Sequence, residues 1–227
     1  MASPAVSDLE QNLAAVRARM ARAAARAGRD PGGIVLIAVT KTFPAARLAE
    51  AYALGVRDFG ENYVQEFETK APELAACSGA RFHLIGHLQS NKARRAAELF
   101  SVIQTVDSAK LARRLAAAGR PLEVMIEVKL SPEEAKAGAD PAELAAIAAA
   151  VRECGNLTLT GLMTMPPWSD DPEASRPYFR QLAGLGRELG LPKLSMGMSH
   201  DFEAAIEEGA THIRVGTALF GRRTPKA

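Results

Sequence analysis

The sequence predicts an α/β protein: a (β/α)8 barrel of the TIM type with one extra helix at its N-terminus. Two observations lead to this prediction. Short apolar segments rich in β-branched residues alternate with alanine-rich, helix-like segments along the chain. Eight strand-like segments can be counted, and a helix-like segment follows each of them. A doubly wound open sheet is the competing architecture, but no Rossmann glycine fingerprint follows the first strand.

The first half of the chain begins with the extra helix and then enters the barrel. We expect this helix over Ser7 to Ala27, because Gly28 and Pro31 follow and end it. The strands expected next cover residues 34–39, 56–59, 81–85 and 100–105. The helices among them cover residues 45–54, a stretch that ends near 74, a stretch that starts near 91, and a stretch that Ser108 caps and that ends at 119.

The second half continues the alternation and closes the barrel. The strands expected here cover residues 122–128, 157–163, a short stretch that ends near 195, and 211–215. The helices cover residues 141–154, 173–189 and a stretch that starts near 201. In a barrel of parallel strands all carboxyl ends share one face, and function is found on that face.

Bulk properties exclude several classes of protein. A chain of 227 residues is long enough to bury a substantial core, and we expect a single domain over residues 1–227. With a formal net charge of +2, the chain lacks the overall excess of basic residues that is expected of a nucleic-acid-binding protein. Cys77 and Cys154 have neither paired spacing nor a histidine cluster, which argues against a disulfide framework and a metal site. Without a membrane-length apolar stretch or a secretory signal, a cytoplasmic protein is expected.

Lys41 is the most informative residue of the chain, since it ends the apolar, β-prone run of residues 34–41 and a helix-like segment follows after Pro44. A lysine at the carboxyl end of a buried strand has apolar side chains on the strand side and an opening toward solvent on the other side. Desolvation favours its neutral amine, and a neutral amine can attack an aldehyde to form a Schiff base. A strand-end lysine that reaches into solvent is the competing interpretation.

Two turns near the end of the chain favour a phosphate site. Residues 195–201 and 213–221 both resemble strand ends that turn through glycine or hydroxyl residues into a helix. Such turns expose backbone N–H groups and add hydroxyl donors, and Ser199, Gly216 and Thr217 are the candidates. Ordinary helix capping by Ser199 and Thr217 is the alternative.

Three further residues lie at the same predicted rim. Arg214, on the last strand, either points across the barrel mouth toward a bound ligand or forms a salt bridge with a barrel carboxylate. Asn62, just after the second strand, either reaches the ligand or caps the next helix. Met198 lines the site or belongs to the core. His87 is also a rim residue, but no orienting partner is evident, so a structural role is expected.

Several segments, in order along the chain, resemble one family. They are Ala38-Val39-Thr40-Lys41-Thr42, Phe59-Gly60-Glu61-Asn62-Tyr63-Val64-Gln65-Glu66, His83-Leu84-Ile85-Gly86-His87-Leu88-Gln89-Ser90-Asn91-Lys92, Glu133-Glu134-Ala135-Lys136-Ala137-Gly138, Gly161-Leu162-Met163-Thr164-Met165-Pro166, Ser195-Met196-Gly197-Met198-Ser199-His200-Asp201 and Ile213-Arg214-Val215-Gly216-Thr217-Ala218-Leu219-Phe220-Gly221. Together they closely resemble the pyridoxal phosphate homeostasis protein family. The resemblance covers residues 7–223, which we take as the ordered core of the domain.

This resemblance implies a barrel of the alanine racemase N-terminal type that binds pyridoxal 5′-phosphate (PLP). It implies that Lys41 forms the Schiff base and that Arg214 lies near the pyridine nitrogen. It also implies that Ser199, Gly216 and Thr217 hold the phosphate.

The chain departs from the family at the rim of the site. Many bacterial members carry a second lysine shortly after the Schiff-base lysine, where this chain has Thr42-Phe43-Pro44. Lys129 stands where the family has an asparagine, while Lys136 remains. The roles of Lys129 and Lys136 in any transfer of the cofactor stay open.

Two functions are weighed. The first is a non-catalytic carrier that keeps free PLP low and passes it to apo forms of PLP-dependent enzymes; a monomer is expected and no catalytic residue is assigned. The second is a PLP-dependent amino-acid racemase. Racemases of this barrel type take a second base from a C-terminal β domain of the partner subunit, and the sequence ends at Ala227 without one. The expectation is therefore a protein that is not an efficient enzyme.

Overall fold

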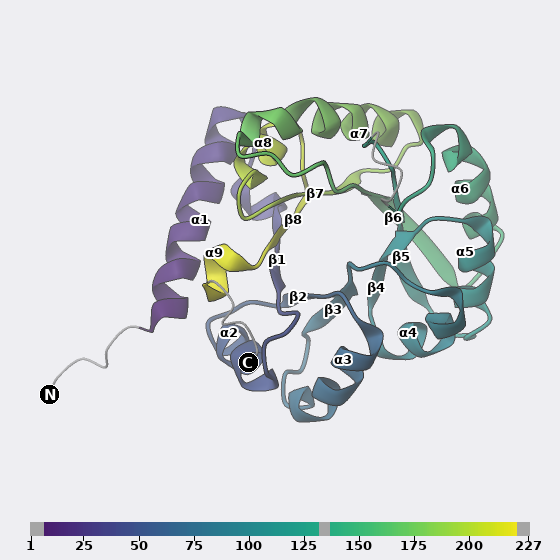
Figure 1. Ribbon diagram of the computed structural model, residues 1–227, viewed down its shortest axis with the longest axis horizontal. Coiled ribbons are helices and arrows are strands. Elements are labelled where there is room, and N and C mark those ends of the chain that lie inside the picture. The colour runs from purple at the N-terminus through teal and green to yellow at the C-terminus, as the bar shows by residue number, and fades with distance from the viewer. Residues whose placement is uncertain (1–6, 132–136, 222–227) are drawn as a thin grey trace, which may run out of the picture.

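In the computed structural model, which describes residues 7–131 and 137–221, eight parallel strands close into a barrel in sequence order. Every neighbouring pair is parallel, and β1 pairs with β8 to complete the ring. Helices surround the ring on its outside (Figure 1). The predicted (β/α)8 barrel is confirmed.

The elements follow the predicted order. The strands are β1 Val35–Val39, β2 Asp58–Glu61, β3 Arg81–Leu84, β4 Val102–Val106, β5 Leu122–Glu127, β6 Leu157–Met163, β7 Lys193–Met198 and β8 His212–Val215. The helices are α1 Asp8–Arg26, α2 Ala45–Ala53, α3 Val64–Lys70, α4 Ala93–Leu99, α5 Ala109–Ala116, α6 Leu144–Arg152, α7 Arg176–Glu188, α8 Phe202–Glu207 and α9 Thr217–Phe220. Short 3₁₀ turns cover Pro31–Gly33, Ala71–Leu74, Ser90–Lys92, Pro141–Glu143 and Pro172–Ser175.

The seventh strand is longer than predicted. It continues past Ser195 to Met198, because Gly197 does not end the strand but shifts its register against β8. Gly197 has a φ of +88°, and a Cβ there would lie 2.5 Å from the Ala205 Cβ of α8. Glycine therefore lets the strand bulge closely against α8 and carries it on toward the barrel mouth.

The extra N-terminal helix is confirmed as α1. Ser7 begins it, since the Ser7 hydroxyl accepts a hydrogen bond from the backbone N–H of Glu10. One face of α1 is buried at Leu13 and Val16, and the helix packs against α8 and α9 outside the barrel (Figure 1). No helix among the described residues is long and apolar enough to cross a membrane.

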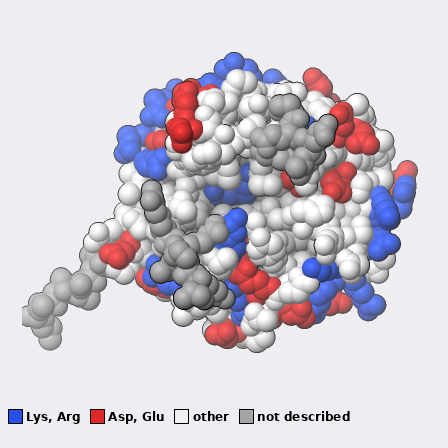
Figure 2. Space-filling model, viewed as in Figure 1, with Lys and Arg blue, Asp and Glu red and all other residues white. Residues whose placement is uncertain are grey.

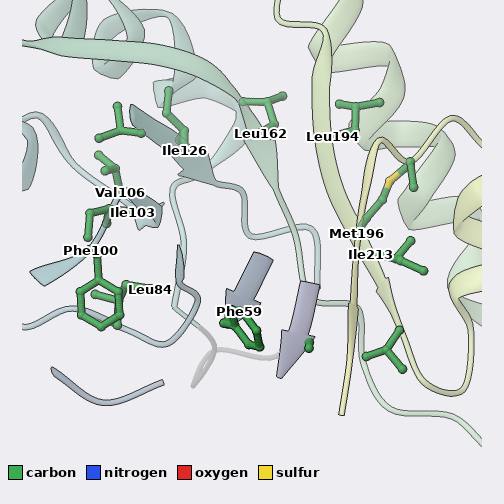
Figure 3. Close-up of a cluster of buried hydrophobic side chains, with 14 of the residues drawn as sticks. Phe59, Leu84, Phe100, Ile103, Val106, Ile126, Leu162, Leu194, Met196 and Ile213 are labelled. Atoms are coloured by element: carbon green, nitrogen blue, oxygen red, sulfur yellow. The ribbon is translucent and has the colours of Figure 1, made fainter. Parts of the chain in front are cut away.

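Apolar side chains on the outer faces of the strands pack under the helices. Figure 3 shows part of this layer, in which Ile126 of β5, Leu162 of β6 and Ile213 of β8 are fully buried. Parallel strands covered on the outside by helices need such apolar residues.

The barrel interior instead carries a chain of polar side chains. His83 Nε2 lies 2.8 Å from Asp58 Oδ1, and His83 Nδ1 lies 3.0 Å from Gln104 Nε2. The Ser195 hydroxyl donates to Gln104 Oε1 over 2.6 Å, and Arg214 Nη1 donates to the Ser195 hydroxyl oxygen over 2.8 Å. The chain thus crosses the barrel from β4 to β7, which are not neighbours in the sheet. Since buried polar groups need partners, this network holds Arg214 in place.

Candidate functional site

A cavity of about 310 Å³ opens at the carboxyl ends of the strands. Every residue that the sequence singled out as a binding residue lines it, namely Lys41, Asn62, Met198, Ser199, Arg214, Gly216 and Thr217. Figure 2 shows the molecule hollowed at the centre of the barrel, with basic atoms inside the hollow. The barrel thus brings together side chains from both ends of the sequence, because β1 and β8 are neighbours.

Lys41 lies two residues after the end of β1, and the backbone on both sides of it is held by hydrogen bonds. The buried Thr40 donates its N–H to the Gly60 carbonyl over 2.9 Å and its hydroxyl to Glu61 Oε1 over 2.8 Å. On the other side, Thr42 has a φ of +70°, a left-handed conformation that costs a non-glycine residue roughly 1–2 kcal/mol. Surrounding contacts must offset this strain.

Those contacts come from a buried ion cluster that the sequence did not reveal. The ammonium of Lys70 donates to the Thr40 carbonyl at 3.0 Å, to Glu61 at 3.0 Å and to Glu66 at 2.6 Å. The same Glu66 oxygen accepts the N–H of Thr42. The backbone before and after the amine-bearing residue is therefore tied to one cluster. The i,i+4 spacing of Glu66 and Lys70 was the available sequence signal.

Burial makes this cluster sensitive to the loss of one charge. The Glu61 side chain is fully buried, which raises the pKa of its carboxyl, while Lys70 opposes that rise. We expect Lys70→Met to lower the free energy of unfolding by about 3–5 kcal/mol, because it leaves buried acid without its cation. Denaturant unfolding followed by circular dichroism measures this loss.

The matched control for Lys70→Met is Arg94→Met. Arg94 is 84% exposed and pairs with Glu98 on the surface, so its removal should cost less than about 1 kcal/mol. If both variants lost the same small amount, the buried cluster would contribute no more than a surface ion pair.

Two backbone N–H groups converge where the phosphate was predicted. The hydroxyl oxygen of Ser199 accepts the N–H of Gly216 at 3.2 Å and the N–H of Ala218 at 3.3 Å. Ser199 therefore does satisfy the first N–H groups of α9, as the capping alternative expected, although it does so from the loop after β7. Thr217 makes no such side-chain bond within the described residues and is exposed toward the cavity. Converging N–H groups and hydroxyls suit an anionic oxygen.

Arg214 is buried and donates to Ser195 Oγ and to the Thr164 carbonyl, each over 2.8 Å. These bonds, rather than a salt bridge to a carboxylate, hold it among the described residues. Burial lowers the pKa of the guanidinium to about 10, so it remains protonated at neutral pH. A fixed cation therefore lines the cavity.

The Asn62 side chain does not cap the helix that follows it. Tyr63 is the N-cap residue of α3, and no side-chain bond caps that helix, so the capping alternative is wrong. The Oδ1 atom of Asn62 is buried without a hydrogen-bond partner. Gly86 makes room for this arrangement, since a Cβ there would lie 2.3 Å from the Asn62 carbonyl oxygen. An unpaired buried amide oxygen indicates a missing donor.

The other rim residues take different places. Met198 is half-buried and lines the cavity, as predicted. His87 lies outside the cavity lining, and its Nδ1 is 3.8 Å from Asp107 Oδ2, a partner that the sequence did not suggest. Lys129 lines a neighbouring cavity, whereas Lys136 lies outside the described residues.

Sequence reasoning also missed Glu127, the last residue of β5. Its side chain is 2% exposed, and its Oε2 atom has no hydrogen-bond partner in the described structure. Burial raises the pKa of this carboxyl to about 7, and nearby Arg214 opposes the rise. Sequence patterns did not single out Glu127, because an acid that ends an apolar strand is usually solvated.

Comparison with known proteins places this site in context. The family described as "Alanine racemase, N-terminal domain" matches residues 11–224. A protein of Pseudomonas aeruginosa named "Pyridoxal phosphate homeostasis protein" is 48% identical, and the match covers 96% of this chain and 97% of that protein. An Escherichia coli K12 protein of the same name is 44% identical, with 96% and 98% covered.

Solved structures show the same fold. PipY of Synechococcus elongatus, solved with PLP bound, is 40% identical with a TM-score of 0.82, and the match covers 94% of this chain and all of that one. Alanine racemase of Corynebacterium glutamicum has a TM-score of 0.69 at 19% identity, which shows a shared fold alone; 96% of this chain matches 64% of that one. The chain therefore belongs to the alanine racemase N-terminal domain family and, within it, to the pyridoxal phosphate homeostasis proteins.

Proposed function

We propose that this protein binds PLP as a Schiff base on Lys41 and serves PLP homeostasis inside the cell as a carrier rather than as an enzyme. The observation that carries the proposal is the meeting of one amine, the two hydroxyl residues Ser199 and Thr217 and a buried guanidinium in a single cavity. The name of the P. aeruginosa relative and the PLP in the PipY structure support it.

The residues present fit this cofactor. Bound PLP would supply an aldehyde that condenses with a neutral primary amine. Lys41 would provide that amine, held by the cluster around Lys70. Ser199, Gly216 and Thr217 would bind the phosphate through N–H and hydroxyl groups. The unpaired Oδ1 of Asn62 would accept a hydrogen bond from a polar group of the ligand.

Arg214 favours the carrier over the enzyme. A guanidinium only donates hydrogen bonds, so opposite a pyridine nitrogen it would keep that nitrogen unprotonated. An unprotonated ring is a weaker electron sink for amino-acid chemistry. The open barrel mouth leaves the cofactor reachable from solvent, which suits exchange with apo enzymes. A monomeric state and a cytoplasmic location stay predictions.

The racemase alternative rests on the fold, which the alanine racemase of C. glutamicum shares at 19% identity. We have assigned no second base among the described residues. Positioned acid–base catalysis contributes roughly a hundredfold or more to such reactions. We therefore propose that amino acids are racemised at negligible rates.

A spectrum and a turnover assay test the proposal. We expect addition of PLP to give an absorption band distinct from that of free PLP, and borohydride to leave the cofactor attached after denaturation. In the same preparation, interconversion of D- and L-alanine should be negligible. A racemase rate in the ordinary enzyme range of roughly 1–1000 per second, from protein free of contaminating racemase, would overturn the carrier assignment.

A further inference from the structure

The hydrogen bonds of the polar chain inside the barrel all run in one direction. Arg214, which lines the cavity where we propose that PLP binds, donates to the Ser195 hydroxyl oxygen over 2.8 Å. A guanidinium only donates, so the single hydroxyl proton of Ser195 is left for Gln104. The 2.6 Å between Ser195 Oγ and Gln104 Oε1 is shorter than an N–H···O bond usually is, which agrees with an O–H donor.

The same direction continues on the other side of Gln104. Because the amide oxygen of Gln104 faces Ser195, its Nε2 group faces His83 Nδ1 at 3.0 Å and donates to it. His83 Nδ1 is then the acceptor of the ring, and the proton of the neutral imidazole is on Nε2. That nitrogen lies 2.8 Å from Asp58 Oδ1 and donates to it. The chain thus begins at a group that only donates and ends at a carboxylate that only accepts.

The charge states of the buried groups agree with this direction. Burial lowers the pKa of the His83 imidazole, although the hydrogen bond to Asp58 opposes the shift, so the ring is neutral at neutral pH. Burial of Asp58 favours its neutral acid, but the hydrogen bond from His83 and the nearby charge of Arg81 outweigh burial and hold the pKa of this carboxyl below its usual range. Hydrogen bonds that share one direction polarise one another, which strengthens the chain as a whole.

Gln104 is the junction of the chain. It is fully buried on β4, and its two hydrogen bonds lead to Ser195 on β7 and to His83 on β3. Within the described residues, Ser195 supplies one of the two hydrogen bonds of Arg214, and the Thr164 carbonyl supplies the other. Without the Gln104 amide, the Ser195 hydroxyl loses its acceptor and is free to rotate away from the guanidinium.

We propose that Gln104 is a positioning residue of the PLP site, which acts on the ligand through Ser195 and Arg214 without touching it. Gln104 does not line the cavity. The inference rests on the proposed binding of PLP and adds a residue to it. A guanidinium that is already held in one orientation loses less side-chain freedom when a ligand binds, so the support raises affinity without a new contact.

Two substitutions of Gln104 test this role by absorption titration of the full chain. Gln104→Met keeps the length of the side chain but removes its amide, and we expect about three- to tenfold weaker PLP binding, the size of one lost hydrogen bond. Pyridoxal should weaken by the same factor, because Arg214 is assigned to the ring and not to the phosphate. Gln104→Glu should bind PLP within about twofold of the wild type, since a carboxylate still accepts the Ser195 hydroxyl.

A double-mutant cycle separates positioning from a general loosening of the barrel. Ser195→Ala should weaken PLP binding, and Gln104→Met added to it should change the affinity little further, because the path through Ser195 is already broken. Thr160→Val is the control: it removes a hydroxyl of β6 that donates to the Val124 carbonyl and should bind PLP as the wild type does. Unchanged affinity in Gln104→Met, additive losses in the double variant, or an equal loss in Thr160→Val would overturn the proposal.

The direction of the chain is tested without any ligand. NMR of isotope-labelled histidine shows which ring nitrogen of each of the four histidines carries the proton, and His83→Gln identifies the signal of His83. We expect the proton on Nε2 in the wild type at neutral pH, and an added proton on Nδ1 in Gln104→Glu, where a carboxylate replaces the amide donor.

The outcomes for the inference and for the proposed function are distinct. A wild-type His83 with its proton on Nδ1 would overturn the inference even if Gln104→Met failed to fold. Wild-type binding of PLP with the wrong result in the variants would overturn the inference alone. Absence of PLP binding by the wild type would overturn the proposed function and the role of Gln104 with it.

Discussion

Replacing Lys41 with alanine is expected to abolish the covalent retention of PLP. In the wild-type protein, borohydride should fix the cofactor to the one peptide that contains Lys41. The variant lacks the amine, which in the wild type lines the same cavity as Gly216 and Thr217 after β8. Mass spectrometry of the reduced, digested protein measures the adduct, which should fall to background.

Lys110→Ala is the matched control for this experiment. Lys110 is an exposed lysine of α5 and does not line the cavity, so its variant should retain the full adduct. Recovery of the reduced adduct mainly on another lysine of the wild-type protein would show that the Schiff base is assigned to the wrong residue.

The combined variant Ser199→Ala, Thr217→Ala should bind PLP much more weakly but pyridoxal almost as well as the wild type. A hydroxyl bond to a charged group contributes roughly 1.5–3 kcal/mol, so two of them correspond to about a hundred- to ten-thousandfold in affinity for the phosphorylated ligand. Pyridoxal has the same ring and aldehyde but lacks the phosphate. Absorption titrations with both ligands measure the ratio.

The ratio also separates binding from structure. Ser199 accepts the N–H groups of Gly216 and Ala218, so its loss could loosen the start of α9. A loosened helix would weaken both ligands equally, and that result would mean that these residues only cap the helix. Ser90→Ala, a change in the 3₁₀ turn before α4 and away from the cavity lining, provides the control for a lost hydroxyl.

The order of the elements could be predicted because the signals are local. Apolar runs such as residues 34–39, and stop signals such as Gly28 and Pro31 after α1, act within a few residues of themselves. Where the prediction was wrong, at the end of β7, a glycine that usually marks a turn instead allowed a bulge against α8. Its role depended on a helix that packs across it, which local patterns do not describe.

The candidate binding residues could also be found from the sequence, because each stands at a strand end or in a turn. Lys41, Ser199 and Gly216 each belong to a short motif whose neighbouring residues predict a strand end or a turn. Their meeting in one cavity followed from barrel closure alone, since strands that run parallel in sequence order bring β1 beside β8.

The partners of these residues became visible only in the folded barrel. Arg214 donates to Ser195 and to the Thr164 carbonyl, and Ser195 in turn donates to Gln104, which lies on a strand across the interior. Glu127 resembles any acid at the end of a strand until the surrounding side chains are seen to bury its carboxyl and leave one oxygen without a donor. Burial and long-range hydrogen bonds depend on which elements pack together. Local sequence therefore establishes the amine and the turns, whereas packing decides which side chains surround them and how they are oriented.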